Sequence, residues 1–309
     1  MRKSFCLRAT LFTLALTVLL PPLAPYTKQV AAQMVPQTDE PSMAYLDKIP
    51  VGTLGEMTDS TRAVGFPTTS WPTPKVTVAF NGGSPELYAL IEATASEWTT
   101  NGGRLTFSFR LSDGSFRTWK ESDTSRTADI RIGFFIDADR NGYWSTVGTF
   151  ARRVKAGEAT MNFGDLGTTL SDYYGGKHHA AWMRSYAHTT ILHEFGHALG
   201  LNHEHFHPQC QSDLKLTDIV NYLMGPPNNW QREQAMYNMD ATTYFAAVSA
   251  KPMFTPMIDQ ASVMLYSFPD SFYKSGRTSP CRPSGPLHYA TELSAEDRDY
   301  YTATYGPNN

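Results

Sequence analysis

Residues 193–203 read His-Glu-Phe-Gly-His-Ala-Leu-Gly-Leu-Asn-His and hold three of the nine histidines of this 309-residue chain. On a helix, His193 and His197 are four residues apart, so both imidazoles project from one face and can reach one ion. Gly200 permits the positive φ with which a backbone leaves a helix. The chain can then bring His203 back as a third ligand. The stretch therefore predicts a helix that ends at a three-histidine metal site.

The residue after the first histidine, Glu194, gives this site a catalytic character. A Glu at this offset does not ligate the metal but lies close enough to hold a metal-bound water. Three protein ligands leave one coordination position open for water, which distinguishes a catalytic zinc from a structural one. A bare His-Glu-x-x-His can also be two surface histidines on a helix, but the added glycine and third histidine favour one catalytic Zn²⁺ with Glu194 as the general base.

Working outward, apolar residues alternate as in strands over residues 76–80, 105–109 and 130–134. Shorter runs at 143–150 and 159–163 can form a hairpin at a sheet edge. Helical spacing of apolar residues predicts helices over about 84–98 and 187–199, and an N-cap at Ser294 predicts a last helix towards Gly306. The sequence therefore predicts an α+β fold with a twisted, mixed five-stranded sheet, two long helices, and an irregular C-terminal part that ends in a helix.

The N-terminus reads as a secretory signal over residues 1–32, with early cations, an apolar run at 11–20 and small residues before a cleavage point. A buried N-terminal helix is the alternative. The run is too short to span a bilayer, which takes about 20 apolar residues, so no transmembrane segment is expected. Residues 33–70 lack a helical or strand period and carry prolines, so we expect a propeptide or extended leader ahead of a catalytic domain at 71–309.

Charge and cysteine content limit the classes of function. The net charge of −3 becomes −7 once the signal is removed, because it carries four cations and no acids. Such a chain is not expected to bind nucleic acid, and we expect a secreted monomer, either extracellular or periplasmic. Cys210 and Cys281 remain after cleavage, and a disulfide between them is expected in an oxidising compartment.

The motif of residues 193–203 resembles that of the metzincin metallopeptidases, which carry a downstream turn with a methionine beneath the metal. Residues 259–266, Asp-Gln-Ala-Ser-Val-Met-Leu-Tyr, supply such a turn with Met264. Glu204 after the third histidine and the Ser-x-Met-x-Tyr turn resemble the astacin branch. The resemblance implies that the two long helices lie above a zinc cleft. It also implies that Tyr266 is a switchable fifth zinc ligand whose hydroxyl stabilises the oxyanion. The alternative, a tyrosine of the lower core, stays open.

The resemblance also implies a substrate-binding edge strand, formed by Trp144, Ser145, Thr146, Val147 and Gly148. Two features depart from the astacin pattern. Animal astacins have two disulfides, which two mature cysteines cannot make. The counterpart of Glu204 contacts the processed N-terminus in those proteins, and the processing site of this chain is not evident from its sequence.

Residues 137–142 match the first half of a calcium loop, with oxygen ligands at Asp137, Asp139 and Asn141. Position 12 of the loop is Gly148 instead of Glu, and acids with Asn-Gly also form ordinary turns. A second ion, Ca²⁺, is therefore a subsidiary hypothesis.

These features favour a secreted zinc endopeptidase that acts on protein or peptide substrates. The alternative from another class is a catalytically silent, secreted module that binds zinc or peptides. A third interpretation is a zinc hydrolase that is not a peptidase. Glu194 argues against the silent module, because a binding module needs no general base.

Overall fold

Five strands form one mixed sheet in the order β2-β1-β3-β5-β4. The strands are β1 (Lys75–Asn81), β2 (Thr106–Ser108), β3 (Ile130–Gly133), β4 (Tyr143–Ser145) and β5 (Met161–Phe163). Neighbouring strands are parallel except for β4, which is antiparallel to β5. This computed structural model describes residues 69–137, 140–164, 166, 186–226, 228–248, 254–284 and 289–306. The predicted mixed five-stranded sheet is confirmed.

The centre of the sheet is β3, which pairs with β1 on one side and β5 on the other. All four of its residues are buried, including Arg131. Burial lowers the pKa of the Arg131 guanidinium to about 10. The guanidinium donates to the backbone oxygen of Ala128, just before β3. It also donates to three backbone oxygens of the segment that joins β4 to β5, those of Val154, Lys155 and Glu158. Arg131 therefore ties the β4–β5 hairpin to the middle of the sheet.

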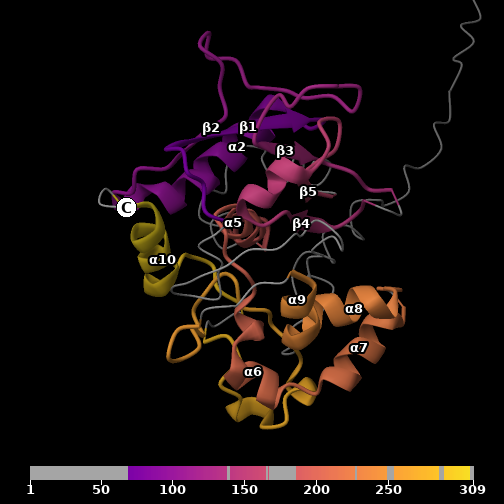
Figure 1. The fold of residues 1–309 in the computed structure, drawn as a ribbon. Helices are drawn as coiled ribbons and strands as arrows, with labels where there is room; N and C mark the ends of the chain where they lie inside the picture. The colour runs from indigo at the N-terminus through magenta and orange to yellow at the C-terminus, as the bar shows by residue number, and fades with distance from the viewer. Residues whose placement is uncertain are drawn as a thin grey trace, which may run out of the picture. The chain divides into compact units, whose positions relative to one another are not determined.

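Two long helices, α2 (Pro85–Ala95) and α5 (Tyr186–Ala198), contact each other, and Figure 1 shows them on the same side of the sheet. The first begins at Pro85 because the Ser84 hydroxyl accepts a hydrogen bond from Leu87 N at 3.3 Å. Every residue from Ala187 to Ala198 is buried. Because α5 is buried so completely, its polar residues are held in defined positions.

The C-terminal end of α5 is fixed by residues from both ends of the described chain. Tyr305, on α10 (Ala295–Tyr305), donates to Leu199 O at 2.7 Å, and the Trp71 indole donates to Ala198 O at 2.6 Å. Carbonyls at a helix end lack partners within the helix. Tyr305 and Trp71 supply partners for two such carbonyls at the point where the chain leaves α5 towards His203. Tertiary contacts therefore help to set the direction in which the chain leaves the helix.

The lower part of the fold differs from the irregular chain that the sequence predicts. It contains four short helices, α6 (Pro208–Asp213), α7 (Leu216–Met224), α8 (Arg232–Met239) and α9 (Ala241–Val248), which lie below α5 in Figure 1. Helices of 6 to 9 residues are too short for a clear period in the sequence, and helices this short depend on tertiary packing.

Helices α6, α7 and α8 pack around a second hydrophobic core that includes Cys210 and Cys281, and α9 packs in a smaller cluster with Phe206 and Tyr237. The two cysteines form a disulfide with their Cα atoms 5.2 Å apart. The bond links α6 to the segment before α10 and so joins two parts of the lower region that are 71 residues apart in the chain.

The signal predicted at residues 1–32 lies outside the described residues, and so does the leader as far as residue 68. Thr69 is described and fully buried. A Cβ atom at Gly148, which has φ of +48°, would lie 2.1 Å from Thr69 O. Thr69 therefore packs against Gly148, and the domain boundary at residue 71 stays a prediction. No helix of the described residues is both long and apolar enough to cross a membrane.

Candidate metal centre

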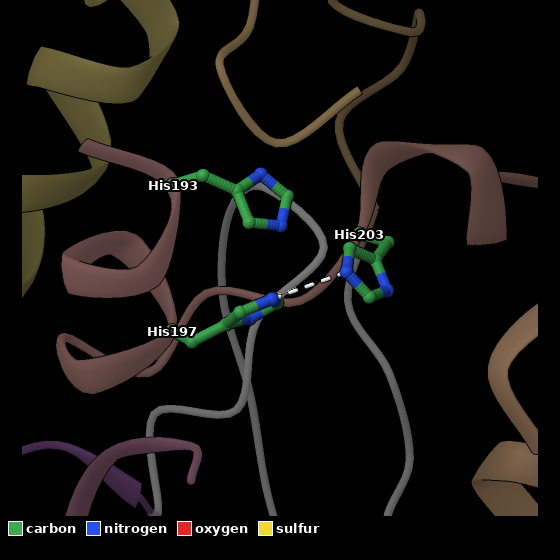
Figure 2. Close-up of side chains that lie close together, drawn as sticks. All are labelled: His193, His197 and His203. Atoms are coloured by element: carbon green, nitrogen blue, oxygen red, sulfur yellow. Dashed lines mark hydrogen bonds between the residues drawn. The ribbon is translucent and has the colours of Figure 1, made fainter. Parts of the chain in front are cut away.

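His193, His197 and His203 converge at the end of α5 (Figure 2). The first two come from successive turns of the helix, and the third comes from the chain just beyond it. One ring nitrogen from each lies within 4.8 Å of the others, and the Nε2 atoms of His197 and His203 are 3.1 Å apart. Within the described part of the chain, no other group of three His, Cys, Asp or Glu residues is arranged to hold a metal.

The hydrogen bonds of two of these rings fix which nitrogen can bind a metal. His193 Nδ1 lies 2.7 Å from Val263 O, and His197 Nδ1 lies 2.8 Å from Leu201 O. A carbonyl only accepts, so Nδ1 carries the proton in both rings and Nε2 keeps its lone pair for a metal. Tetrahedral zinc with Zn–N bonds of about 2.0–2.1 Å separates its nitrogen ligands by roughly 3.4 Å. The donor set and spacing therefore fit zinc.

Glycines allow the backbone geometry around these ligands. Gly200 has φ of +101°, in the left-handed region, and its N–H donates to His197 O at 2.8 Å. This turn takes the chain from α5 to His203, as the sequence predicts. On α5 itself, a Cβ atom at Gly196 would lie 2.4 Å from Met264 Sδ. Only a glycine lets the methionine turn pack this closely against the ligand-bearing helix.

Tyr266 also lies at this centre. Its ring centroid is 4.3 Å from that of His203 and 6.0 Å from that of His193. The same side chain belongs to the lower hydrophobic core and is only 5% exposed. Tyr266 therefore packs in the lower core with its ring close to the histidines, and its role as a zinc ligand stays a prediction.

Comparisons with known proteins address the family. No protein-family model and no curated protein matches the chain. A solved structure of myroilysin is 29% identical with a TM-score of 0.56, and the match covers 78% of this chain and 97% of that one. A crystal structure of myroilysin is 26% identical with a TM-score of 0.47, covering 84% and 98%. High choriolytic enzyme 1, a hatching enzyme zinc-protease from Oryzias latipes (Medaka fish), is 15% identical with a TM-score of 0.42, covering 76% and 92%.

The fold is similar to that of myroilysin, and together with the histidine triad it matches the resemblance to astacin-like metzincins. The structure also gives the position of Glu194, the general base that the sequence predicts. Glu194 lies on α5 directly after the first ligand and is fully buried. Burying a carboxylate costs several kcal/mol unless a positive charge or hydrogen bonds compensate for it. A cation held by the adjacent histidines would supply such compensation.

The edge strand of this astacin-like fold is shorter than predicted. Trp144 and Ser145 lie in β4, at the end of the sheet order, and β4 contacts α5. Thr146 and Val147 continue beyond the strand and are buried. Gly148 is not part of the strand, because a 3₁₀ helix (Gly148–Arg153) begins there and its positive φ bends the backbone against Thr69. Of the five predicted residues, only Trp144 and Ser145 therefore lie in the strand.

His205 was not assigned a role by the sequence, yet it is fully buried beside the site. Its Nε2 donates to Asn238 O at 2.9 Å, and its ring stacks on Tyr266 with centroids 4.5 Å apart. Its position two residues after a ligand was the available signal. Two other histidines have structural contacts, His188 with Glu97 and His207 with Thr255 O.

The calcium loop is not supported. The Asp137 carboxylate pairs with Arg140 at 2.7 Å, and Arg140 also pairs with Glu121. Asp139 lies outside the described residues. The Asn141 N–H donates to Asp137 O at 2.9 Å, which is a turn contact. The contacts of Asp137 and Asn141 are therefore those of a turn, the other interpretation of the pattern.

Proposed function

We propose that this protein is a secreted, zinc-dependent endopeptidase. The observation that carries the proposal is the convergence of three buried histidines, two on α5 and one from the chain just beyond it, with a buried Glu194 next to the first. His193, His197 and His203 would hold the ion. The similarity in fold to myroilysin, over nearly all of that chain, supports this assignment.

Zinc, when bound, supplies a Lewis acid and lowers the pKa of its water to about 7. Glu194 would act first as the general base and then as the general acid. Its carboxylate takes one proton from the attacking water as the oxygen adds to the peptide carbonyl carbon. It then delivers that proton to the amide nitrogen as the carbon–nitrogen bond breaks, so that an acid and an amine are released.

Tyr266 would stabilise the negative charge that develops on the carbonyl oxygen. Its ring contacts those of His203 and His205, with centroids 4.3 Å and 4.5 Å away. A hydroxyl held in a buried position donates its hydrogen bond without a reorganisation cost at the moment of reaction.

Substrate would bind by adding an extended peptide to β4. This strand ends the sheet order and contacts α5, so a peptide paired with it would run past the histidines. Pairing of this kind uses backbone hydrogen bonds and makes little demand on side chains. We therefore expect cleavage of unfolded proteins with broad sequence tolerance.

Secretion is proposed from the signal pattern of residues 1–32 together with the disulfide between Cys210 and Cys281. Disulfides persist in oxidising compartments outside the cytosol. N-terminal sequencing of protein exported by its host should find a start beyond residue 32. Protein that retains its initiating methionine and stays in the cytosol would contradict secretion.

The activity is tested with Glu194→Gln, assayed on casein with and without a zinc chelator. Removal of a general base lowers turnover by about 10²–10⁴-fold, while zinc content should match that of the wild type. Glu92→Gln, on the outer surface of α2, is the matched control and should cleave casein normally. Substantial turnover by Glu194→Gln contradicts the role of Glu194. Zinc-loaded wild type that cleaves no casein or peptide library would favour the silent binding module.

A further inference from the structure

A buried carboxylate lies beneath the methionine turn. Asp297, in the first turn of α10, is 3% exposed. One of its oxygens accepts from the Ser262 hydroxyl at 2.7 Å, and the other accepts from Val263 N at 3.1 Å. The sequence identifies Asp297 only as an acid at a helix start. The structure shows that it also holds a turn 34 and 35 residues away in the chain.

The same turn contacts both ligand-bearing segments. Val263 O accepts from His193 Nδ1 at 2.7 Å, and Met264 O accepts from Glu204 N at 2.9 Å. Glu204 directly follows His203 in the chain. The turn is braced internally by Ser262, whose hydroxyl accepts from Met264 N at 3.0 Å. Two carbonyls of one short turn therefore set the position of one ligand ring and of the backbone next to another.

Asp297 is itself anchored on α10. Ser294 N donates to the Asp297 carboxylate at 3.0 Å, and Asp297 N donates to the Ser294 hydroxyl at 2.9 Å, which is a capping box. Burial raises the pKa of Asp297 in spite of its hydrogen bonds. An ionisable group kept in such a place costs free energy that a helix cap at the surface would not cost.

We infer that Asp297 is a positioning residue for the metal centre: it orients the turn of residues 262–264 and thereby holds His193 and the segment of His203 in their metal-binding arrangement. The inference rests on the proposed function only in that the three histidines bind zinc. Partners one shell beyond the ligands typically change metal affinity by about 10–100-fold when they are removed.

The test is Asp297→Asn, which keeps the shape of the side chain but replaces one acceptor oxygen with a donor. Zinc affinity is measured by competition with a chromogenic chelator, and the geometry by the visible absorption spectrum of the cobalt-substituted protein. We expect zinc to bind about 10–100-fold more weakly and the cobalt bands to shift. Neither measurement requires a substrate.

Ser84→Ala is the matched control for stability. It removes the hydrogen bond from Leu87 N to the Ser84 hydroxyl, which caps the N-terminus of α2. It should lower the unfolding temperature without changing zinc affinity or the cobalt spectrum. If Asp297→Asn behaves like Ser84→Ala in both measurements, Asp297 is only a helix cap and the inference is overturned.

Ser262→Ala is a second variant that decides the case if Asp297→Asn does not fold. It removes the hydrogen bond from the Ser262 hydroxyl to the Asp297 carboxylate and leaves the capping box of α10 intact. Zinc should bind more weakly to Ser262→Ala alone. Where Asp297→Asn folds, the two substitutions combined should weaken binding less than the product of their separate effects. Wild-type zinc affinity in Ser262→Ala, or independent effects in the double variant, contradicts the inference. Wild type that binds zinc but cleaves nothing would overturn the proposed function and leave this inference standing.

Discussion

The metal centre is built from two regions that are specified in different ways. Helix α5 supplies His193, Glu194 and His197 at positions that follow from helical spacing. The chain beyond Gly200 supplies His203 and Tyr266, which are placed by a disulfide, by short helices and by the turn over Asp297. The difference teaches that half of the site follows from local geometry, whereas the other half depends on packing between distant segments.

Removal of the disulfide should have the largest effect on this comparison. Cys210 and Cys281 are 71 residues apart in the chain, and a loop of that length stabilises a fold by about 4 kcal/mol in the chain-entropy model. We expect the double variant Cys210→Ser/Cys281→Ser to lose about 4 kcal/mol in urea unfolding. Hydrogen exchange should show amide protection lost in α6–α9 and retained in β1 and β3. Equal loss of protection in both regions would contradict the division.

Tyr266→Phe tests the packed half of the site with a smaller effect. Loss of one oxyanion donor typically lowers kcat by about 10²–10³-fold, or about 3–4 kcal/mol. KM and zinc content should change little, because the ring and its contacts with the histidines remain. Tyr237→Phe, a buried tyrosine that packs on Tyr244 in the lower region, is the control and should keep its kcat. Unchanged kinetics in Tyr266→Phe would remove its proposed role.

Gly196→Ala probes the contact between the two regions and should have the smallest effect. Helix propensity alone predicts a gain of about 1 kcal/mol. The added Cβ would lie 2.4 Å from Met264 Sδ and 3.1 Å from Trp98, and overpacking costs about 1–3 kcal/mol. We therefore expect a net loss of about 1 kcal/mol in the free energy of unfolding. In a Met264→Ala background the penalty should disappear, and a stabilised single variant would contradict the close contact.

Much of the upper region could be predicted from sequence. Alternating apolar residues located β1, β3 and the β4–β5 hairpin, and the spacing of His193 and His197 located the helix that carries them. The end of α5 at Gly200 was predictable because a left-handed residue at that point has a clear chemical signature.

The lower region and the outer contacts could not be predicted in the same way. Helices as short as α6 do not repeat an apolar position often enough to be recognised. Asp297 looked like any acid in a first helical turn, and its second role depends on a turn far away in the chain. The edge strand ends at Ser145, and the close approach of Gly148 to Thr69 beyond it is not encoded by any local pattern.

The central claim is that His193, His197 and His203 hold one zinc with a position open for water. Zinc analysis combined with zinc-edge X-ray absorption on the purified wild type tests it most directly. The account predicts one zinc per chain, bound by three imidazole nitrogens at about 2.0–2.1 Å with an additional exchangeable light ligand. Protein without zinc, or a zinc shell that contains sulfur or is closed by four protein ligands, would contradict it.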